Sequence, residues 1–128
     1  MHINDPDVLA ELEIAFAKYE AALVGNDVAG LDAAFWTSPQ TIRYGAGENL
    51  YGHREIAAFR AARPPTGLDR SLERTVLTTY GRDFGTASTL FRRAAAPGRL
   101  GRQMQSWVHF PEGWRVVAAH VSLIDDLA

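Results

Sequence analysis

The spacing of apolar residues changes near residue 70, and this change constrains the fold more than any other feature of the sequence. Before it, apolar residues recur every three or four positions, which is typical of a helix with one buried face. These residues are Leu9, Leu12, Phe16, Tyr19 and Leu23. After it, apolar and polar residues alternate, which is typical of half-buried strands. Helices followed by a strand meander predict one α+β domain over residues 1–128.

Local signals set the bounds of the predicted elements. Asp5 can cap the first helix with Pro6 at its first position, and Asp27 can cap the second. Pro64 and Pro65 stop the third. The predicted helices are 5–25, 27–35 and 52–63. The predicted strands are 35–38, 41–44, 72–80, 84–93, 100–110 and 114–122. Short separators rich in Gly, Pro and Asp join the last four strands, which predicts antiparallel hairpins.

Composition narrows the class of protein. The chain has no cysteine, so it has neither disulfides nor thiolate chemistry. A net charge of −2 argues against a nucleic-acid partner, and no apolar run has the length of a membrane span. The N-terminus does not resemble a signal peptide, which predicts a cytoplasmic protein. The four histidines lack ligand spacing, so we expect no metal site, and no cofactor is implied.

Arg43 lies within a short strand-like segment, residues 41–45, that is expected to be half buried. A buried guanidinium needs a carboxylate, a backbone acceptor or a ligand, because an unpaired buried charge is costly. Arg43 is therefore a candidate for holding a substrate carboxylate through two hydrogen bonds. The alternative is an internal ion pair with Glu48 or exposure at the sheet edge.

Tyr19 is a second polar intrusion, on the apolar stripe of the first helix. Its hydroxyl is a candidate proton donor to a ligand. The alternative is that Tyr19 is a core aromatic residue whose hydroxyl bonds to a backbone group. His120 is expected to share a strand face with Trp114 and Val116, where it either contacts a ligand or is a satisfied core histidine.

Gln103, Gln105 and Trp107 share one face of a predicted strand, and the tryptophan favours that face as the buried one. Two amides and an indole suit a small ligand rich in C=O and N–H groups. Arg60 is a candidate second cation at the cavity mouth, with a solvated helix edge as the alternative. For Arg63 we expect the solvated edge. The arginines around the tip of the 93–99 hairpin are expected to be solvated, with an anionic partner as the alternative; they are Arg92, Arg93, Arg99 and Arg102.

The chain resembles the HpxZ/AtzH-like family of the nuclear-transport-factor-like (SnoaL-like) superfamily. The resemblance covers nearly the whole sequence, and Met104 departs from it where a smaller polar residue is expected. The matching segments are Asp5-Pro6 with Tyr19, Arg43-Tyr44-Gly45 with Glu48, Gly52 with Ile56 and Phe59-Arg60, Gly101-Arg102-Gln103 with Gln105 and Trp107, and Gly113-Trp114 through Ala119-His120-Val121-Ser122.

This resemblance implies a cone-shaped fold with three helices on a curved antiparallel sheet. It also implies an enzyme of nitrogen catabolism that acts with an amidase, removing a carboxyl or carbamoyl group from a small carboxylated urea or an oxalurate-like compound. Tyr19 and Arg43 would be catalytic. The expected substrate-binding residues are Tyr44, Arg60, Gln103, Gln105, Trp107 and His120. The alternative is an accessory module that binds a small acid or the amidase.

A homodimer is also expected. Helices on one face of a curved sheet leave the other face uncovered. The strand residues expected there are too apolar for a wholly wetted surface; they are Val108, Val117, Val121 and either Leu90 or Phe91.

Overall fold

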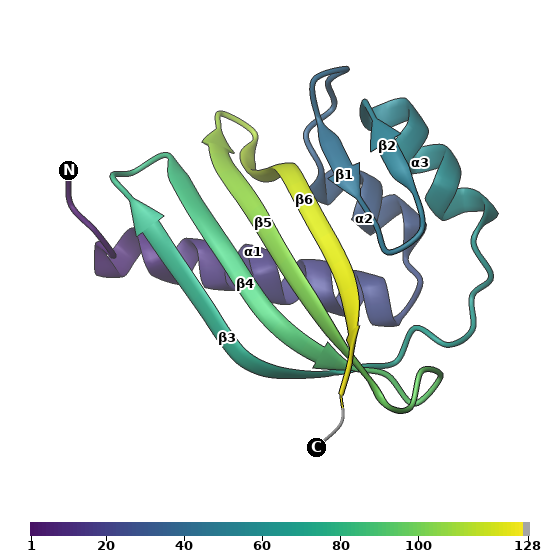
Figure 1. Ribbon diagram of the computed structural model, residues 1–128. Helices are drawn as coiled ribbons and strands as arrows, with labels where there is room; N and C mark the ends of the chain where they lie inside the picture. Colours follow the sequence, from purple (N-terminus) through teal and green to yellow (C-terminus); the bar gives the residue numbers. More distant parts are fainter. Residues whose placement is uncertain (127–128) are drawn as a thin grey trace.

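The computed structural model describes residues 1–126, which form three helices and six strands (Figure 1). The helices are α1 (Pro6–Val24), α2 (Val28–Ala34) and α3 (His53–Ala62). The strands are β1 (Ile42–Tyr44), β2 (Asn49–Tyr51), β3 (Ser71–Tyr80), β4 (Phe84–Arg92), β5 (Arg99–Phe110) and β6 (Gly113–Asp125). The predicted caps are confirmed: the Asp5 side chain accepts from the Asp7 amide and that of Asp27 from the Gly30 amide.

The strands form one sheet in the order β2-β1-β6-β5-β4-β3. The four long strands are antiparallel neighbours in chain order, as the sequence predicted. The sheet as a whole is mixed, however, because β1 lies parallel to β6. The long connection is compatible with a parallel pair, because α3 and four strands separate β1 from β6 in the chain.

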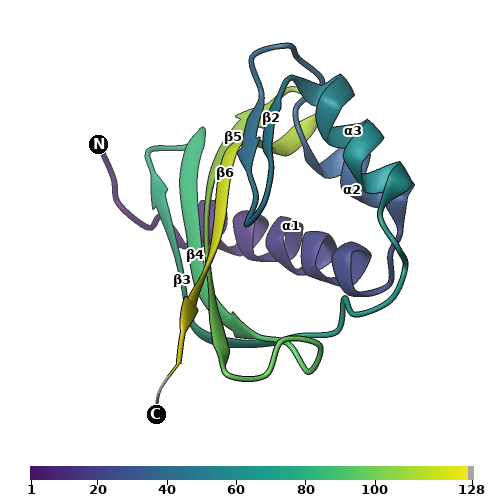
Figure 2. The ribbon, with the colours of Figure 1, turned by 45° about the vertical axis from the view of Figure 1, so that its right-hand side comes forward.

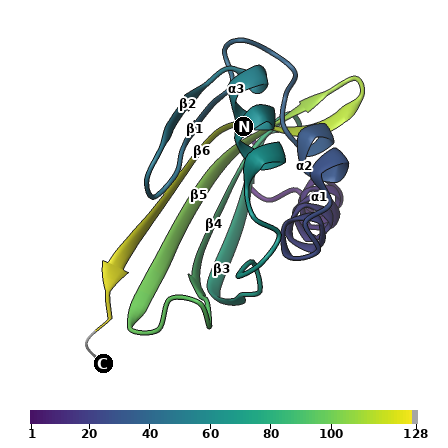
Figure 3. The same cartoon turned by 90° about the vertical axis from the view of Figure 1, so that its right-hand side faces the viewer.

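All three helices cover the same face of the curved sheet, and the opposite face is uncovered (Figures 2 and 3). The core lies between these layers. α1 crosses the sheet and buries a stripe made of Val8, Leu12, Phe16, Tyr19 and Ala22. This arrangement gives the cone-shaped fold that the resemblance implied, with the helices packed over the concave face of the sheet (Figures 2 and 3).

One short strand was predicted wrongly and one was missed. In place of the strand at 35–38, the structure has a single bridge between Phe35 and Val116. β2 pairs only with β1, at the edge of the sheet. Three residues are too few to show an alternating pattern, so β2 was not recognised from the sequence.

A β-bulge at Val117 changes which face the end of β6 presents. Trp107 on β5 is opposite Val116, whereas Ser106 is opposite Ala118, so Val117 is an extra residue. Before the bulge Trp114 and Val116 point inward, and after it Ala119 does. An extra residue exchanges the two faces of a strand, because side chains alternate with a period of two.

The uncovered face of the sheet carries several large exposed side chains, including Met104 on β5, Val76 on β3 and Tyr51 on β2. Val121, which was assigned to this face, instead lines an internal cavity. Within residues 1–126, no helix has the length and hydropathy of a membrane span.

Candidate functional site

A small cavity of about 80 Å³ lies between the helices and the sheet, and we call it the arginine cavity. Its walls are Tyr19, Leu23, Arg43, Arg63, Leu68, Arg70, Phe91, Arg93, Gln103 and Val121. Four of these are arginines and none is acidic. Glu48 and Glu20, just outside, each pair with one arginine. Within residues 1–126, two of these guanidiniums therefore have no carboxylate partner, and the cavity is electropositive.

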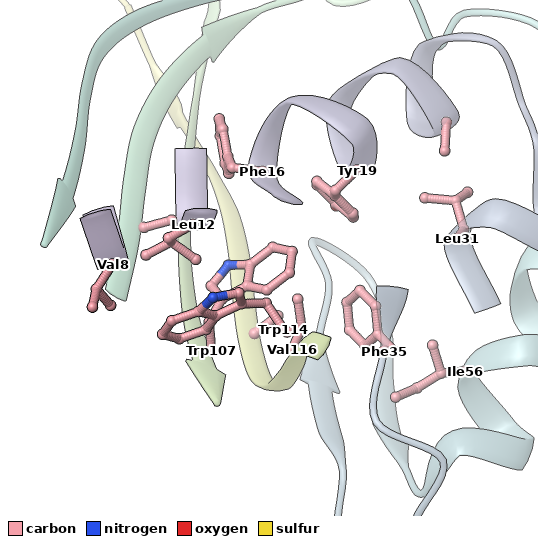
Figure 4. Packing of buried hydrophobic residues seen from close by; sticks show 13 residues of the cluster. Val8, Leu12, Phe16, Tyr19, Leu31, Phe35, Ile56, Trp107, Trp114 and Val116 are labelled. Atoms are coloured by element: carbon pink, nitrogen blue, oxygen red, sulfur yellow. The ribbon is translucent and has the colours of Figure 1, made fainter. Parts of the chain in front are cut away.

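Tyr19 projects from α1 into the centre of the molecule, toward Phe35 and the two core tryptophans (Figure 4). Its ring meets that of Trp107 edge-on, with centroids 6.4 Å apart. The hydroxyl has no hydrogen-bond partner among the described residues and is not among their fully buried atoms that lack one, so it borders open space. A core aromatic would be expected to satisfy its hydroxyl, so this geometry favours a hydroxyl available to a ligand.

Arg43 is paired internally and also lines the cavity. Its Nη1 donates to Glu48 Oε1 at 2.8 Å, and its guanidinium lies 5.6 Å from the centre of the Phe59 ring. The turn holds this pair tightly, because a Cβ on Gly45 would lie 1.7 Å from Glu48 Oε1. Nε and Nη2 of Arg43 have no hydrogen-bond partner within the described chain. Glu48 thus orients the guanidinium and leaves one edge of it for an anion.

Arg70 links three elements beside the cavity. It forms a buried ion pair with Glu20 of α1, in which Nε donates to Oε2 at 3.1 Å. Its Nη2 also donates to Gln103 Oε1 on β5 at 3.0 Å. Gln103 Nε2 has no partner among the described residues. The amide face of β5 is buried as predicted, and Gln103 offers an unused donor next to the arginine cavity.

Arg60 is buried, so the solvated alternative is wrong. Its Nη1 donates to the Leu31 carbonyl at 3.2 Å, and its guanidinium lies 4.1 Å from the centre of the Phe35 ring. Nε has no partner within residues 1–126. Burial is the main cause that lowers the pKa of Arg60, to about 10. The ionised form of Tyr19 would raise this pKa, whereas the positive charges of Arg43 and Arg63 lower it further. The group therefore adds positive potential close to Tyr19.

Arg63 was expected at a solvated edge, but it lines the arginine cavity. Its Nε and Nη2 are buried without a partner among the described residues. Burial is the main cause that lowers the pKa of Arg63, and the positive charge of nearby Arg43 lowers it further. A buried guanidinium with unused donors is costly unless an anion completes it.

Gln105 and Trp107 continue the buried face of β5 away from the arginines. The Trp107 indole donates to Gln105 Oε1 at 3.1 Å, whereas Gln105 Nε2 is buried without a partner among the described residues. Trp107 lines a second, larger cavity of about 440 Å³ between α1 and α2, which Tyr19 also borders. Alanines and one glycine, among them Ala22 and Ala34, form half of its lining residues. Of the predicted site residues this cavity contacts only Tyr19 and Trp107, so the arginine cavity is the better candidate site.

Tyr44 and His120 lie on the outer face of the sheet. Tyr44 alternates with Arg43 and so points the opposite way, and the bulge at Val117 turns His120 outward. Their rings meet edge-on with centroids 6.0 Å apart, and the Tyr44 hydroxyl lies 3.0 Å from that of Tyr51. The expectation that His120 shares a face with Trp114 is wrong, and neither residue reaches the arginine cavity.

Sequence analysis missed Arg63, Arg70, Arg93 and Glu20. Arg63 and Arg70 stand at the two ends of an irregular connector, where no periodicity indicates a direction. Arg93 directly follows β4 and was assigned to a solvated hairpin tip. For Glu20 the only signal was its place beside Tyr19. Within the described residues, no three His, Cys, Asp or Glu side chains are grouped so as to hold a metal ion.

Comparisons with known proteins agree with this architecture. The model of the AtzH-like family matches residues 1–127. A solved structure of a DUF3225-family protein from Pectobacterium atrosepticum is 61% identical, with 96% of this chain and 95% of that one covered and a TM-score of 0.93. A cystatin-like fold protein from Burkholderia xenovorans is 48% identical, with 98% of each chain covered and a TM-score of 0.94.

An NTF2-like protein of unknown function from Pseudomonas putida is 17% identical over 94% of this chain and 89% of that one. Its TM-score of 0.78 shows a shared fold. The comparison with curated proteins gave no match.

Proposed function

The chain belongs to the AtzH-like family, and we propose that it is an enzyme that removes a carboxyl group from the nitrogen of a small carboxylated urea. The observation that supports this most is the Tyr19 hydroxyl, which has no partner within the described chain and borders a cavity lined by four arginines. We place the enzyme in nitrogen catabolism, beside an amidase that supplies or consumes such compounds.

In this proposal the free edge of Arg43 binds a substrate carboxylate, and Glu48 keeps the guanidinium in place. Arg63 supplies further donors to the substrate oxygens, and Gln103 Nε2 supplies one more. Charge-assisted hydrogen bonds of this kind are about twice as strong as neutral ones. Arg60 acts at longer range, because its charge favours an anion near Tyr19 without touching it.

The reaction needs one bond cleavage and one proton transfer. The N–C bond of the N-carboxyl group breaks, the carbon leaves as CO₂, and the electron pair stays on nitrogen. Tyr19 donates its proton to that nitrogen, and water then returns a proton to the phenolate. Positioning and electrostatic stabilisation supply most of the rate increase in such a step. The surrounding guanidiniums stabilise the transient phenolate.

The alternative is an accessory module that binds a small acid without turnover. The same four arginines support it, because anion binding alone would use them. It does not require a tyrosine hydroxyl free of protein partners, so the Tyr19 geometry favours the enzyme.

Turnover of N-carboxyureas, followed as CO₂ release, tests the proposal. We expect Tyr19→Phe to keep the fold and the affinity for malonate, an unreactive dicarboxylate, and to slow turnover about 100-fold or more, which is the usual contribution of a general acid.

We expect Arg43→Lys to weaken malonate binding by roughly 10- to 100-fold in calorimetry, because an ammonium cannot replace the guanidinium fork. Wild-type turnover by Tyr19→Phe would exclude Tyr19 as the acid. Malonate binding without any turnover by the wild type would favour the accessory module.

A further inference from the structure

The arginine cavity is too small for the ligand class proposed above. Its volume is about 80 Å³, whereas pockets that hold small molecules usually measure about 300–1,000 Å³. Several of its wall residues, such as Tyr19, Phe91 and Gln103, are buried. If the proposed function is right, a carboxylated urea fits between Tyr19 and these arginines only when part of the wall moves.

Most of the wall cannot move easily. Tyr19 and Leu23 belong to α1. The remaining wall residues outside the connector between α3 and β3 belong to β1, β4, β5 and β6 or, in the case of Arg93, directly follow β4. Their backbones are held by helix and sheet hydrogen bonds. The exception is the connector between α3 and β3, residues 63–70, which contains no helix or strand. It supplies Arg63, Leu68 and Arg70 to the wall.

The connector is attached firmly at its ends and weakly in its middle. Arg70 is fixed at one end by Glu20 and Gln103, and the Arg63 amide donates to the Arg60 carbonyl at the other. Between these ends, the described structure has one attachment through hydrogen bonds. Arg93 donates to the Gly67 carbonyl from Nε, at 2.9 Å, and from Nη2. This contact is exposed to solvent.

Leu68 follows Gly67 directly and is the apolar side chain that the connector inserts into the wall. Release of the Gly67 carbonyl would let Leu68 swing outward without breaking the buried Arg70 ion pair. We infer that residues 64–69 are a gate over the arginine cavity, with the Arg93–Gly67 contact as its latch. The gate opens to admit the anion and closes over it.

Thiol labelling tests this without any substrate. The chain has no cysteine, so Val121→Cys places a single thiol in the cavity wall. The probe is 5,5′-dithiobis(2-nitrobenzoate), an anion larger than the cavity, so the rate of its reaction reports how far the cavity opens. We compare Val121→Cys alone with the same variant carrying Arg93→Gln or Arg92→Gln.

Arg92 is the matched control, because it pairs with Glu73 and Asp126 and not with the connector. We expect Arg93→Gln to raise the labelling rate by roughly three- to tenfold, which corresponds to the loss of one weak hydrogen-bonded contact. We expect Arg92→Gln to leave the labelling rate unchanged or to lower it. Loss of a positive charge alone slows an anionic reagent, so the expected rise has the opposite sign to the electrostatic effect. Equal rates in the two variants would overturn the gate. If Val121→Cys does not fold, Leu23→Cys serves the same purpose on the α1 side of the cavity.

A reversible cross-link separates the gate from the proposed function. A Cβ on Gly67 would lie 3.3 Å from the Ala95 Cβ, close to the spacing in disulfides, so Gly67→Cys with Ala95→Cys can form one. The positive φ of Gly67 strains both redox forms alike. We expect oxidation to lower turnover at least tenfold and reduction to restore it.

Turnover unaffected by oxidation would overturn the gate even if the enzyme acts as proposed. If the wild type has no turnover at all, the proposed function is wrong, and the labelling rates alone decide the gate.

Discussion

The buried charge of Arg60 leads to a quantitative prediction: Arg60→Met should not destabilise the protein. Burial is the main reason that the pKa of Arg60 falls from its ordinary value to about 10. Each pKa unit corresponds to about 1.4 kcal/mol, so the environment disfavours the charged form by about 3 kcal/mol. Methionine fills a similar elongated space without the charge or the partnerless Nε.

Two lost contacts oppose this gain. The guanidinium stacks over Phe35 at 4.1 Å, and such a contact is worth about 1–2 kcal/mol when buried. The hydrogen bond to the Leu31 carbonyl contributes about 1 kcal/mol. The net expectation is therefore a free energy of unfolding that is unchanged or higher by up to about 1 kcal/mol.

Urea denaturation followed by far-ultraviolet circular dichroism measures this difference. Arg54→Met is the control, because Arg54 lies on the exposed side of the same helix. A loss of more than about 2 kcal/mol specific to Arg60→Met would show that the guanidinium anchors the fold, and it would refute the argument. Malonate should bind the variant more weakly, since one positive charge beside Tyr19 is gone.

The pH dependence follows from the sign of the shift. The folded-state pKa of Arg60 lies below the unfolded value, so the folded state binds fewer protons between them. The penalty is present in full below the folded-state pKa and disappears as the pH rises toward the unfolded-state pKa. The difference between wild type and Arg60→Met should therefore be constant below about pH 9, and a difference that varies in the neutral range would implicate another group.

Two further predictions concern the turn beside the site and the outer face of the sheet. Gly45→Ala should displace Glu48 and release Arg43, lowering the free energy of unfolding by about 1–3 kcal/mol in urea titrations, and an unchanged value would show that the turn relaxes freely. We also propose that the outer face joins two copies over more than about 1,000 Å². Met104→Asp should then convert a dimer to a monomer in light scattering, and a monomeric wild type would contradict the dimer.

The sequence was sufficient to predict the parts of the fold that repeat a pattern. The helical stripe that includes Tyr19 and the alternation along β5 both specify a buried face over many residues. Gln103 and Gln105 share a strand face with Trp107, so the expected burial of the tryptophan was enough to predict that both glutamines point inward. The order of the four long strands followed from their short turns.

The sequence was insufficient where one residue decides the geometry. Nothing in the alternation of β6 marks Val117 as a bulge, so His120 was placed on the wrong face. The connector of residues 63–70 has no regular spacing of apolar residues, so the inward direction of Arg63 could not be inferred. Glu48 was recognised as a possible partner of Arg43, but sequence could not decide between an ion pair and a ligand site, and the structure has the pair beside a cavity.

The bulge at Val117 also means that the chemistry of the concave surface depends on how β6 pairs with β5 as well as on residue identity. If Val117 paired with Ser106 in a regular ladder, the later residues of β6 would shift by one position against β5, which would turn the His120 imidazole inward and Ala119 outward. An imidazole would then lie on the side of the sheet that carries Arg43 and Gln103, where it would add a group that both donates and accepts protons. A change of register at such a position offers a cone of this kind a route to new acid–base chemistry with the same residues in β6.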